Sequence, residues 1–169
     1  MTVLAEGNLV RLRTIRVPDL KAAVAHPYSL SATEPMTDLG WARSVHDQTG
    51  FWTPKAGVAA FEVAERLIGT MQFYSPGPTV HGFEIGYSVH NEDDRGKGFG
   101  SEALRLFSDL LFAQHPECHR LQLIIAVENF ADARTVEHCG YAAEGTLRKA
   151  HYTAPGEPAD CLIYSRVRD

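Results

Sequence analysis

The stretch EIGYSVHNEDDRGKGFGSEALRLF, residues 84–107, changes pattern twice and decides the fold. Its first residues belong to an alternating run over 83–90, in which polar Glu84 and Ser88 interleave with apolar side chains, as in a half-buried strand. Its last residues begin a run over 101–114 with apolar side chains at helical spacing. A polar segment and the glycines of RGKGFG lie between the two runs. The sequence therefore predicts a strand and a helix joined by a glycine-rich loop.

This loop has the composition of an anion site. Gly96, Gly98 and Gly100 have no Cβ, so successive backbone N–H groups can approach one point. The helix expected to begin at Ser101 adds the positive end of its dipole. The alternative is an ordinary turn between a strand and a helix, which glycines also form. The glycines alone do not separate these two interpretations.

Two well-known nucleotide loops are excluded by the spacing. A Walker A loop requires glycine five positions before Gly96, where this chain has Asn91, and Ser or Thr after Lys97, where it has Gly98. A dinucleotide fingerprint requires G-x-G-x-x-G, whereas the spacing here is G-x-G-x-G.

The composition favours one soluble, cytoplasmic domain. The chain has 169 residues, of which 44% are hydrophobic, so one core suffices. A formal net charge of −5 without long runs of like charge argues against a nucleic-acid partner. Three cysteines without a C-x-x-C pair indicate reduced thiols, and the metal-like cluster HPECHR lacks a partner pair, so no metal is expected. No segment resembles a leader or a membrane span.

Hydrophobic periodicity predicts a mixed α/β (α+β) fold around one mostly antiparallel sheet of about seven strands with flanking helices. Strands are expected over 8–15, 58–63, 67–74, 83–90 and 120–128, with two more in the tail around a Pro-Gly turn. Helices are expected over 17–26, 38–50, 101–114 and 131–138. The weakly patterned region 27–55 is interpreted as the mobile part that faces the substrate.

The loop and the segments after it resemble a known family. RGKGFG matches the pattern [RQ]-x-x-G-x-[GA], with Arg95, Gly98 and Gly100 in place, and resembles motif A of the GNAT superfamily of N-acetyltransferases. The later segment VENFADARTVEHCGYAAEGTLRK is similar to the subgroup that acetylates ribosomal-protein N-termini, the RimJ and RimL type. The resemblance covers most of the chain and is thinnest between residues 27 and 51.

The resemblance implies a single N-acetyltransferase domain over residues 1–169 that uses acetyl-CoA as cosubstrate. Acetyl-CoA would lie in a V-shaped gap between the fourth and fifth strands. The pyrophosphate would lie on the backbone amides of Arg95, Gly96, Lys97, Gly98, Phe99, Gly100 and Ser101. The pantetheine arm would follow Val89, His90 and Asn91, with Asn129 on its other side. Asn129 would also serve well as a helix N-cap, and the two roles are compatible.

The catalytic groups are less well defined by the sequence. The amine must lose a proton before it can attack, and Glu84 is the favoured base, with Glu128 and His90 as rivals. Many family members place a general-acid Tyr seven residues after the motif Asn, where this chain has Val136. Asp132 replaces a frequent Ser. The remaining thiol and phenol, Cys139 and Tyr141, are interpreted as packing residues.

The function expected from these features is direct acetyl transfer from acetyl-CoA to a primary amine, either a protein N-terminus or a small molecule. The absent Tyr keeps open an alternative, a catalytically silent module of the same fold that senses acyl-CoA. A different nucleotide-phosphate binder is a third alternative. Trp41, Phe51 and Trp52 are interpreted either as walls of an acceptor pocket or as core residues. The resemblance also allows a homodimer.

Overall fold

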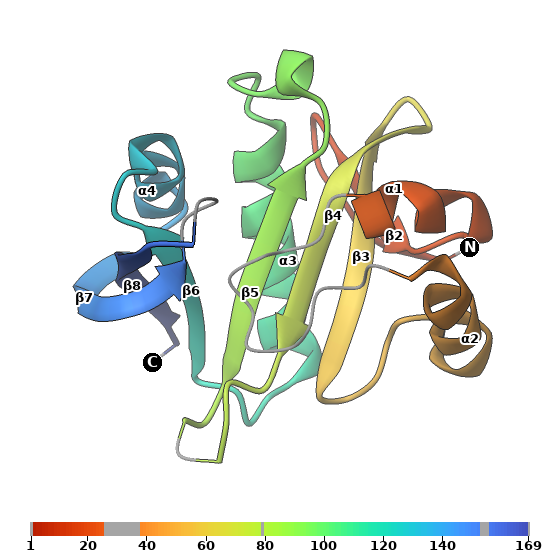
Figure 1. Cartoon of the computed structure of the whole chain (residues 1–169). Helices are drawn as coiled ribbons and strands as arrows, with labels where there is room; N and C mark the ends of the chain where they lie inside the picture. Colours follow the sequence, from red (N-terminus) through yellow and green to blue (C-terminus); the bar gives the residue numbers. More distant parts are fainter. Residues whose placement is uncertain (1, 26–37, 79, 153–155, 169) are drawn as a thin grey trace.

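One continuous β-sheet forms the centre of the protein (Figure 1). The computed structural model describes residues 2–25, 38–78, 80–152 and 156–168, and within these ranges the sheet has eight strands in the order β1-β2-β3-β4-β5-β6-β8-β7. Neighbouring strands are antiparallel except for the β5–β6 pair, which is parallel. The strands are β1 (Val3–Glu6), β2 (Arg11–Thr14), β3 (Ala56–Val63), β4 (Arg66–Tyr74), β5 (Phe83–Val89), β6 (Arg120–Ala126), β7 (Ala142–Tyr152) and β8 (Pro158–Val167).

Helices cover the two faces of this sheet. The long α3 (Phe99–Gln114) and α4 (Phe130–His138) contribute to the main core cluster together with β-strand residues such as Phe61, Phe73 and Ile85. The opposite face carries a smaller cluster, to which α1 (Leu20–Ala25) and α2 (Leu39–Thr49) contribute. Two short 3-10 turns, η1 (Val17–Asp19) and η2 (Glu92–Asp94), precede α1 and α3. Because side chains alternate along the strands, the sheet contributes residues to two separate apolar cores, one on each face.

The predicted elements are present, with differences at their ends. The sequence predicted about seven strands, and the eighth is β1, whose four residues are too short and too exposed to give a clear alternation. Helix α3 begins two residues before the predicted Ser101, inside the glycine loop. The predicted helix over 38–50 is α2. Residues 27–37 of the weakly patterned region lie outside the described residues, so the predicted mobility of this region stays a prediction.

The predicted V-shaped gap lies between β5 and β6. The two strands pair only at Phe83 with Leu121 and at Glu84 with Gln122. Beyond this point β5 remains paired with β4 and β6 remains paired with β8. Figure 1 shows the two ribbons diverging toward the end of β5, where the glycine loop follows. Because β1 adds a strand before them, the fourth and fifth strands of the prediction are β5 and β6.

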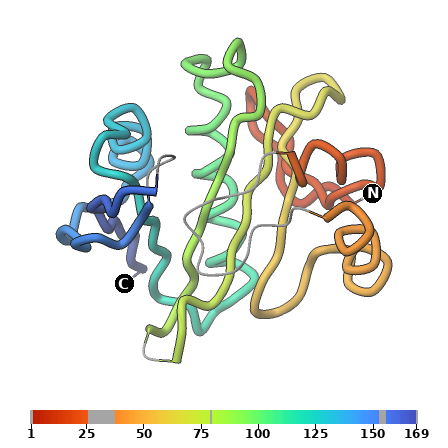
Figure 2. Tube along the Cα trace, viewed as in Figure 1, coloured from red at the N-terminus to blue at the C-terminus, as the bar shows by residue number. Residues whose placement is uncertain are grey.

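The chain crosses the sheet from one edge to the other. In Figure 2 the N-terminal strands lie on one side of α3 and the β7–β8 hairpin lies on the other side. β7 forms the far edge of the sheet, and most of its residues are exposed.

Candidate functional site

The backbone of β5 presents unpaired polar groups to the gap. The N–H of His90 donates to the carbonyl of Ile68 at 2.9 Å, on the β4 side. Because backbone groups alternate along a strand, the N–H and C=O groups of Val89 and Tyr87 point the other way, toward β6. Of the residues predicted to accompany the pantetheine arm, Val89 therefore has the required orientation, whereas the His90 amide is already used.

The turn after β5 is ordered by its own side chains. Asn91 begins η2, and its Oδ1 atom accepts a hydrogen bond from the N–H of Asp93 at 3.0 Å. The N–H of Arg95 closes the turn on the carbonyl of Glu92 at 3.0 Å. Asn91 and the Arg95 amide are thus part of the turn, which leaves the amides from Gly96 onward as the candidate anion donors.

The glycine loop leaves the first turn of α3 uncapped. Gly98 is the N-cap of α3 and provides no side chain to its amides. The first amides of a helix have no intrahelical acceptor, so those of Phe99, Gly100 and Ser101 are suited to an anion. Gly96 and Gly98 have φ angles of +72° and +82°, and a Cβ on Gly96 would meet nothing within 4 Å. The loop therefore has the features of an anion site, and binding of the CoA pyrophosphate stays a prediction.

Two carboxylates that sequence reasoning missed anchor this loop. Asp94 is buried and forms a two-pronged ion pair with Arg66, at 2.7 and 2.8 Å, which holds the pKa of Asp94 below its usual value. Glu102, in the first turn of α3, accepts three backbone N–H bonds from Asn8, Leu9 and Val10, at 3.0, 2.6 and 2.7 Å. The Asp94 ion pair holds the loop against the β3–β4 hairpin, and the Glu102 hydrogen bonds hold it against the β1–β2 turn. Neither pairing has a local sequence signal.

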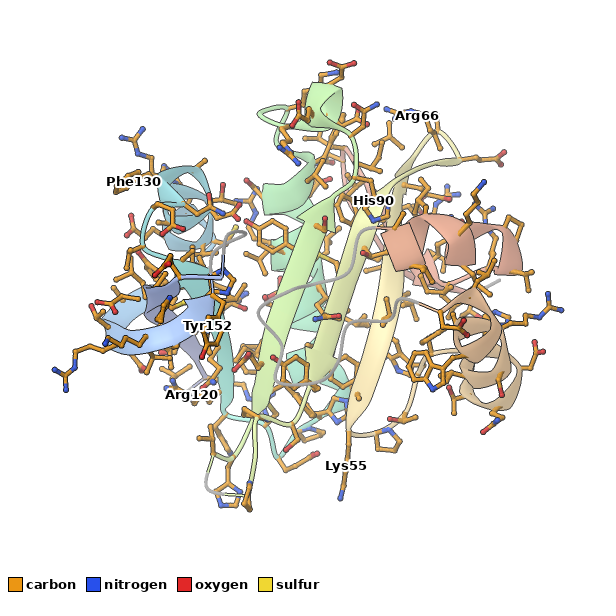
Figure 3. All side chains as sticks on the ribbon, viewed as in Figure 1. Lys55, Arg66, His90, Arg120, Phe130 and Tyr152 are labelled. Carbon is orange, nitrogen blue, oxygen red and sulfur yellow. The ribbon has the colours of Figure 1, made fainter. Side chains whose placement is uncertain are left out.

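Basic side chains flank the same loop. Lys97 lies with its Nζ atom 4.0 Å from Oδ1 of Asp94, and Arg95 lies with Nη1 3.4 Å from Glu92. Both side chains are more than half exposed, so they can turn toward a phosphate at low cost. Figure 3 shows Arg66 and His90 at this end of the sheet.

The predicted partner on the other side of the gap, Asn129, is the N-cap of α4. Its Oδ1 accepts the N–H of Asp132 at 3.3 Å, and its Nδ2 donates to Oδ2 of Asp132 at 2.6 Å. The second N–H of the amide group is the one through which Asn129 can contact a ligand. The expected N-cap role is present, and contact with pantetheine stays a prediction.

Asp132 also links α4 to β5. The hydroxyl of Tyr87 donates to Oδ1 of Asp132 at 3.0 Å. Burial of the ring, together with this carboxylate, raises the pKa of Tyr87 above its ordinary value. Tyr87 is therefore a neutral hydrogen-bond donor beside the gap and a poor source of a proton.

Glu84 lies where the gap closes, in a site unlike the exposed strand edge that is usual for Glu. It is 5% exposed, its Oε1 atom accepts the hydroxyl of Tyr74, and its Oε2 atom accepts Nε2 of Gln122 at 2.9 Å. Alternation places His90 on the same face, where its Nε2 lies 3.3 Å from Oγ1 of Thr70. Glu128 is exposed in the turn after β6. Of the two carboxylates considered as the base, Glu84 and Glu128, Glu84 is the one whose side chain is fixed by hydrogen bonds.

The other candidate proton donors are used in packing. Val136, in place of the frequent Tyr, is fully buried in the core. The thiol of Cys139 donates to the carbonyl of Ser101 at 3.3 Å, and burial raises its pKa. Tyr141 is buried with its hydroxyl 2.8 Å from Oγ of Ser108, and burial likewise raises its pKa. Burial thus makes both groups weaker acids.

The three N-terminal aromatics divide between core and surface. Trp52 packs edge-on against Phe73 and Phe107, with centroid distances of 5.1 and 6.2 Å. Phe51 belongs to the smaller core cluster, whereas Trp41 on α2 is about half exposed, at 54%. Of the three, Trp41 is the most exposed, and its contact with an acceptor stays a prediction.

Among the described residues, no three His, Cys, Asp or Glu side chains gather in a way that could hold a metal ion. No helix in the described ranges is long and apolar enough to cross a membrane.

A parallel pair of strands that diverges beside an uncapped, glycine-initiated helix is the arrangement expected from the sequence resemblance to the GNAT acetyltransferases. A family profile described as "Acetyltransferase (GNAT) domain" matches residues 10–142. The chain therefore belongs to the GNAT acetyltransferase domain family. The sequence resemblance to this family is confirmed.

The chain is also similar to individual proteins of known sequence or structure. A kanamycin resistance protein of Rhizobium radiobacter is 32% identical over 89 residues, which cover 53% of this chain and 75% of that protein. RimL, a ribosomal L7/L12 alpha-N-protein acetyltransferase solved with coenzyme A, superimposes with a TM-score of 0.76 at 18% identity over 99% of both chains. The spermidine/spermine N-acetyltransferase SpeG of Vibrio cholerae gives a TM-score of 0.77 at 20% identity, over 94% of this chain and 92% of SpeG. At these identities the two structures show the shared fold.

Proposed function

We propose that this protein transfers the acetyl group of acetyl-CoA directly to a primary amine. The observation that carries the proposal is the divergence of β5 and β6 after only two paired positions, with the glycine loop at the open end of the gap. An extended ligand that binds its phosphates on the loop enters the gap beside β5 and reaches toward Glu84.

The binding half of the mechanism uses backbone groups. The amides from Gly96 to Ser101 bind the pyrophosphate, assisted by Lys97 and Arg95. The gap-facing N–H and C=O groups of Val89 and Tyr87 pair with the amides of the pantetheine arm, as an additional strand would. Such contacts depend on the backbone, so they hold the arm without selecting among acceptors.

Acetyl-CoA supplies the reactive thioester carbonyl, and the chain supplies the base. Primary amines are mostly protonated at neutral pH, because their pKa values lie at about 8 to 10, so a proton must leave before attack. Glu84 lies at the last position where β5 and β6 pair, at the closed end of the gap. From there it takes the proton through one water molecule.

Departure of the thiolate needs little help in this site. A free thiol has a pKa of about 8.5, so the CoA sulfur leaves as an anion more readily than an alkoxide does. A gap-facing N–H of β5 can stabilise the charge that develops on the carbonyl oxygen. The presence of Val136 at the frequent Tyr position is therefore compatible with turnover.

The acceptor class is narrowed by the relatives. One is a kanamycin resistance protein, one acetylates a ribosomal-protein N-terminus, and one acetylates spermidine or spermine, as their names state. The last two names specify amine acceptors, and kanamycin itself carries primary amines. The acceptor amines to test with this protein are therefore an aminoglycoside, a polyamine and a peptide with a free N-terminus.

The test is release of free CoA thiol from acetyl-CoA in the presence of each amine. Thiol release that depends on one of these amines supports the proposal. CoA binding without thiol release for any amine would instead support the acyl-CoA sensor. Stabilisation against heat by ATP or NAD, with none by CoA, would support a different nucleotide binder.

A further inference from the structure

Glu84 is one end of a hydrogen-bonded chain that crosses the closed end of the gap. Gln122 on β6 donates to Glu84 and accepts from Nε of Arg120 at 3.1 Å. Arg120 in turn donates to both oxygens of Glu144 on β7, at 2.8 and 2.6 Å, and Ser165 on β8 donates to Glu144 at 2.6 Å. Figure 3 shows Arg120 beside the start of β6, at the opposite end of the sheet from His90.

The chain fixes the direction of each hydrogen bond. The Nε–H of Arg120 can only donate, so the Gln122 atom that faces it must be the carbonyl oxygen. The amide nitrogen of Gln122 must then face Glu84 and donate to it. Because Gln122 and Glu84 are both 5% exposed, water does not readily replace either bond. Arg120 therefore sets the orientation in which Gln122 meets Glu84.

The charges along the chain are unevenly distributed. Glu144 accepts hydrogen bonds from both terminal nitrogens of Arg120. These bonds, together with the one from Ser165, lower the pKa of Glu144 to about 2. No ion pair joins Glu84 to a Lys, Arg or His among the described residues. Its two donors, Tyr74 and Gln122, are neutral groups. Glu84 is thus held by neutral donors where the gap closes, with no fixed cation paired to it in the described part of the chain.

We propose that Gln122 is a positioning residue for Glu84, and that the Arg120–Glu144 ion pair both orients Gln122 and keeps the arginine charge away from Glu84. This inference rests on the proposed acetyl transfer with Glu84 as the base. In this arrangement Glu84 is rigid and remains unpaired with a fixed cation. Its carboxylate is then available to take the proton of the arriving ammonium group through one water molecule.

The chain predicts opposite effects for two substitutions. Gln122→Met removes a donor to Glu84, so the acidic limb of the pH–rate profile moves to higher pH by about one unit, and kcat/KM for the amine at pH 7 falls about tenfold. Glu144→Gln removes the carboxylate that neutralises Arg120, so the acidic limb moves to lower pH by about a few tenths of a unit. KM for acetyl-CoA stays unchanged in both variants.

The experiment measures kcat/KM against pH for the wild type and both variants, with the amine that releases most thiol. Asp109→Asn is the matched control, because it breaks a 2.7 Å ion pair between Asp109 on α3 and Arg166 on β8 and leaves the hydrogen-bonded chain intact. Its profile should superimpose on that of the wild type. Thermal unfolding of each variant checks that the fold is retained.

Opposite shifts would establish the positioning role. Lower rates without a shift in either variant, or shifts in the same direction, would refute it. If the buried Gln122→Met variant does not fold, the partly exposed Glu144 still decides the question, since an unshifted Glu144→Gln profile refutes the role of the ion pair. Failure of the wild type to acetylate any amine would instead count against the proposed function.

Discussion

Replacement of Gly98 by Ala separates the binding role of the loop from its structural role. Gly98 has a φ of +82°, a conformation that costs an L-residue about 1–2 kcal/mol. The added Cβ would lie 3.4 Å from Leu9, which is close to ordinary contact, so strain is the main penalty. At about 2–4 °C per kcal/mol for a domain of this size, the melting temperature should fall by about 2–8 °C.

The effect on CoA binding should be larger than this loss of stability. A hydrogen bond to a charged group contributes about 1.5–3 kcal/mol. Displacement of one loop amide from the pyrophosphate should therefore weaken CoA binding about 10- to 100-fold. Isothermal titration with CoA measures the affinity, and calorimetry of the apo protein measures the melting temperature.

Gly50→Ala is the control for backbone strain. Gly50 ends α2 with a φ of +62°, and a Cβ there would meet nothing within 4 Å. This variant should lose a similar amount of stability and keep the wild-type affinity for CoA. Unchanged CoA affinity in Gly98→Ala, or an equal loss of affinity in Gly50→Ala, would show that the loop does not bind the pyrophosphate.

Four further predictions follow from individual side chains. Glu84→Gln should lower kcat at neutral pH and remove the acidic limb of the pH–rate profile while CoA affinity is retained; an unaltered profile would place the base elsewhere. Glu102→Gln leaves one acceptor oxygen for three N–H groups and should cost about 1–3 kcal/mol in urea unfolding, whereas an unchanged midpoint would refute its anchoring role. Arg66→Gln should remove the closest cation from Asp94 and weaken CoA binding relative to the wild type more at low salt than at high salt, because screening already weakens the ion pair at high salt. An equal loss of affinity at both salt concentrations would contradict this. Hydrogen bonds lower the pKa of Glu144 from an ordinary 4.5 to about 2, so its stabilising contribution is present above pH 4.5 and is lost as the pH falls toward 2. The difference in the free energy of unfolding between the wild type and Glu144→Gln, measured in urea, should therefore be seen at pH 7 and vanish near pH 2.

Much of the fold could be predicted because its signals are local. The alternation in β5, the apolar stripe of α3 and the αL glycine after α4 each follow from neighbouring residues. The glycine loop was found the same way, because its spacing is contiguous. β1 was missed because four partly exposed residues give no period, and its place in the sheet is set by tertiary contacts with β2 and α3.

The anchors of the site could not be predicted, because they join residues far apart in the sequence. Glu102 bonds to residues more than 90 positions away, and Asp94 pairs with Arg66 across 28 positions. The surroundings of Glu84 also depend on partners from β4 and β6. From the sequence, Glu84 had the pattern of a residue on a polar strand face, which is usually exposed. Its burial follows from the pairing of β5 with β6 at that position.

The most direct test of acetyl transfer compares three quantities in one reaction of the protein with acetyl-CoA and an amine. These are the acetylated amine, the free CoA thiol and the intact mass of the protein. Direct transfer predicts that acetylated amine and thiol form in equal amounts while the protein keeps its mass, and that Gly98→Ala reduces both products together. Thiol release without acetylated amine, or no product from any amine despite tight CoA binding, would contradict it.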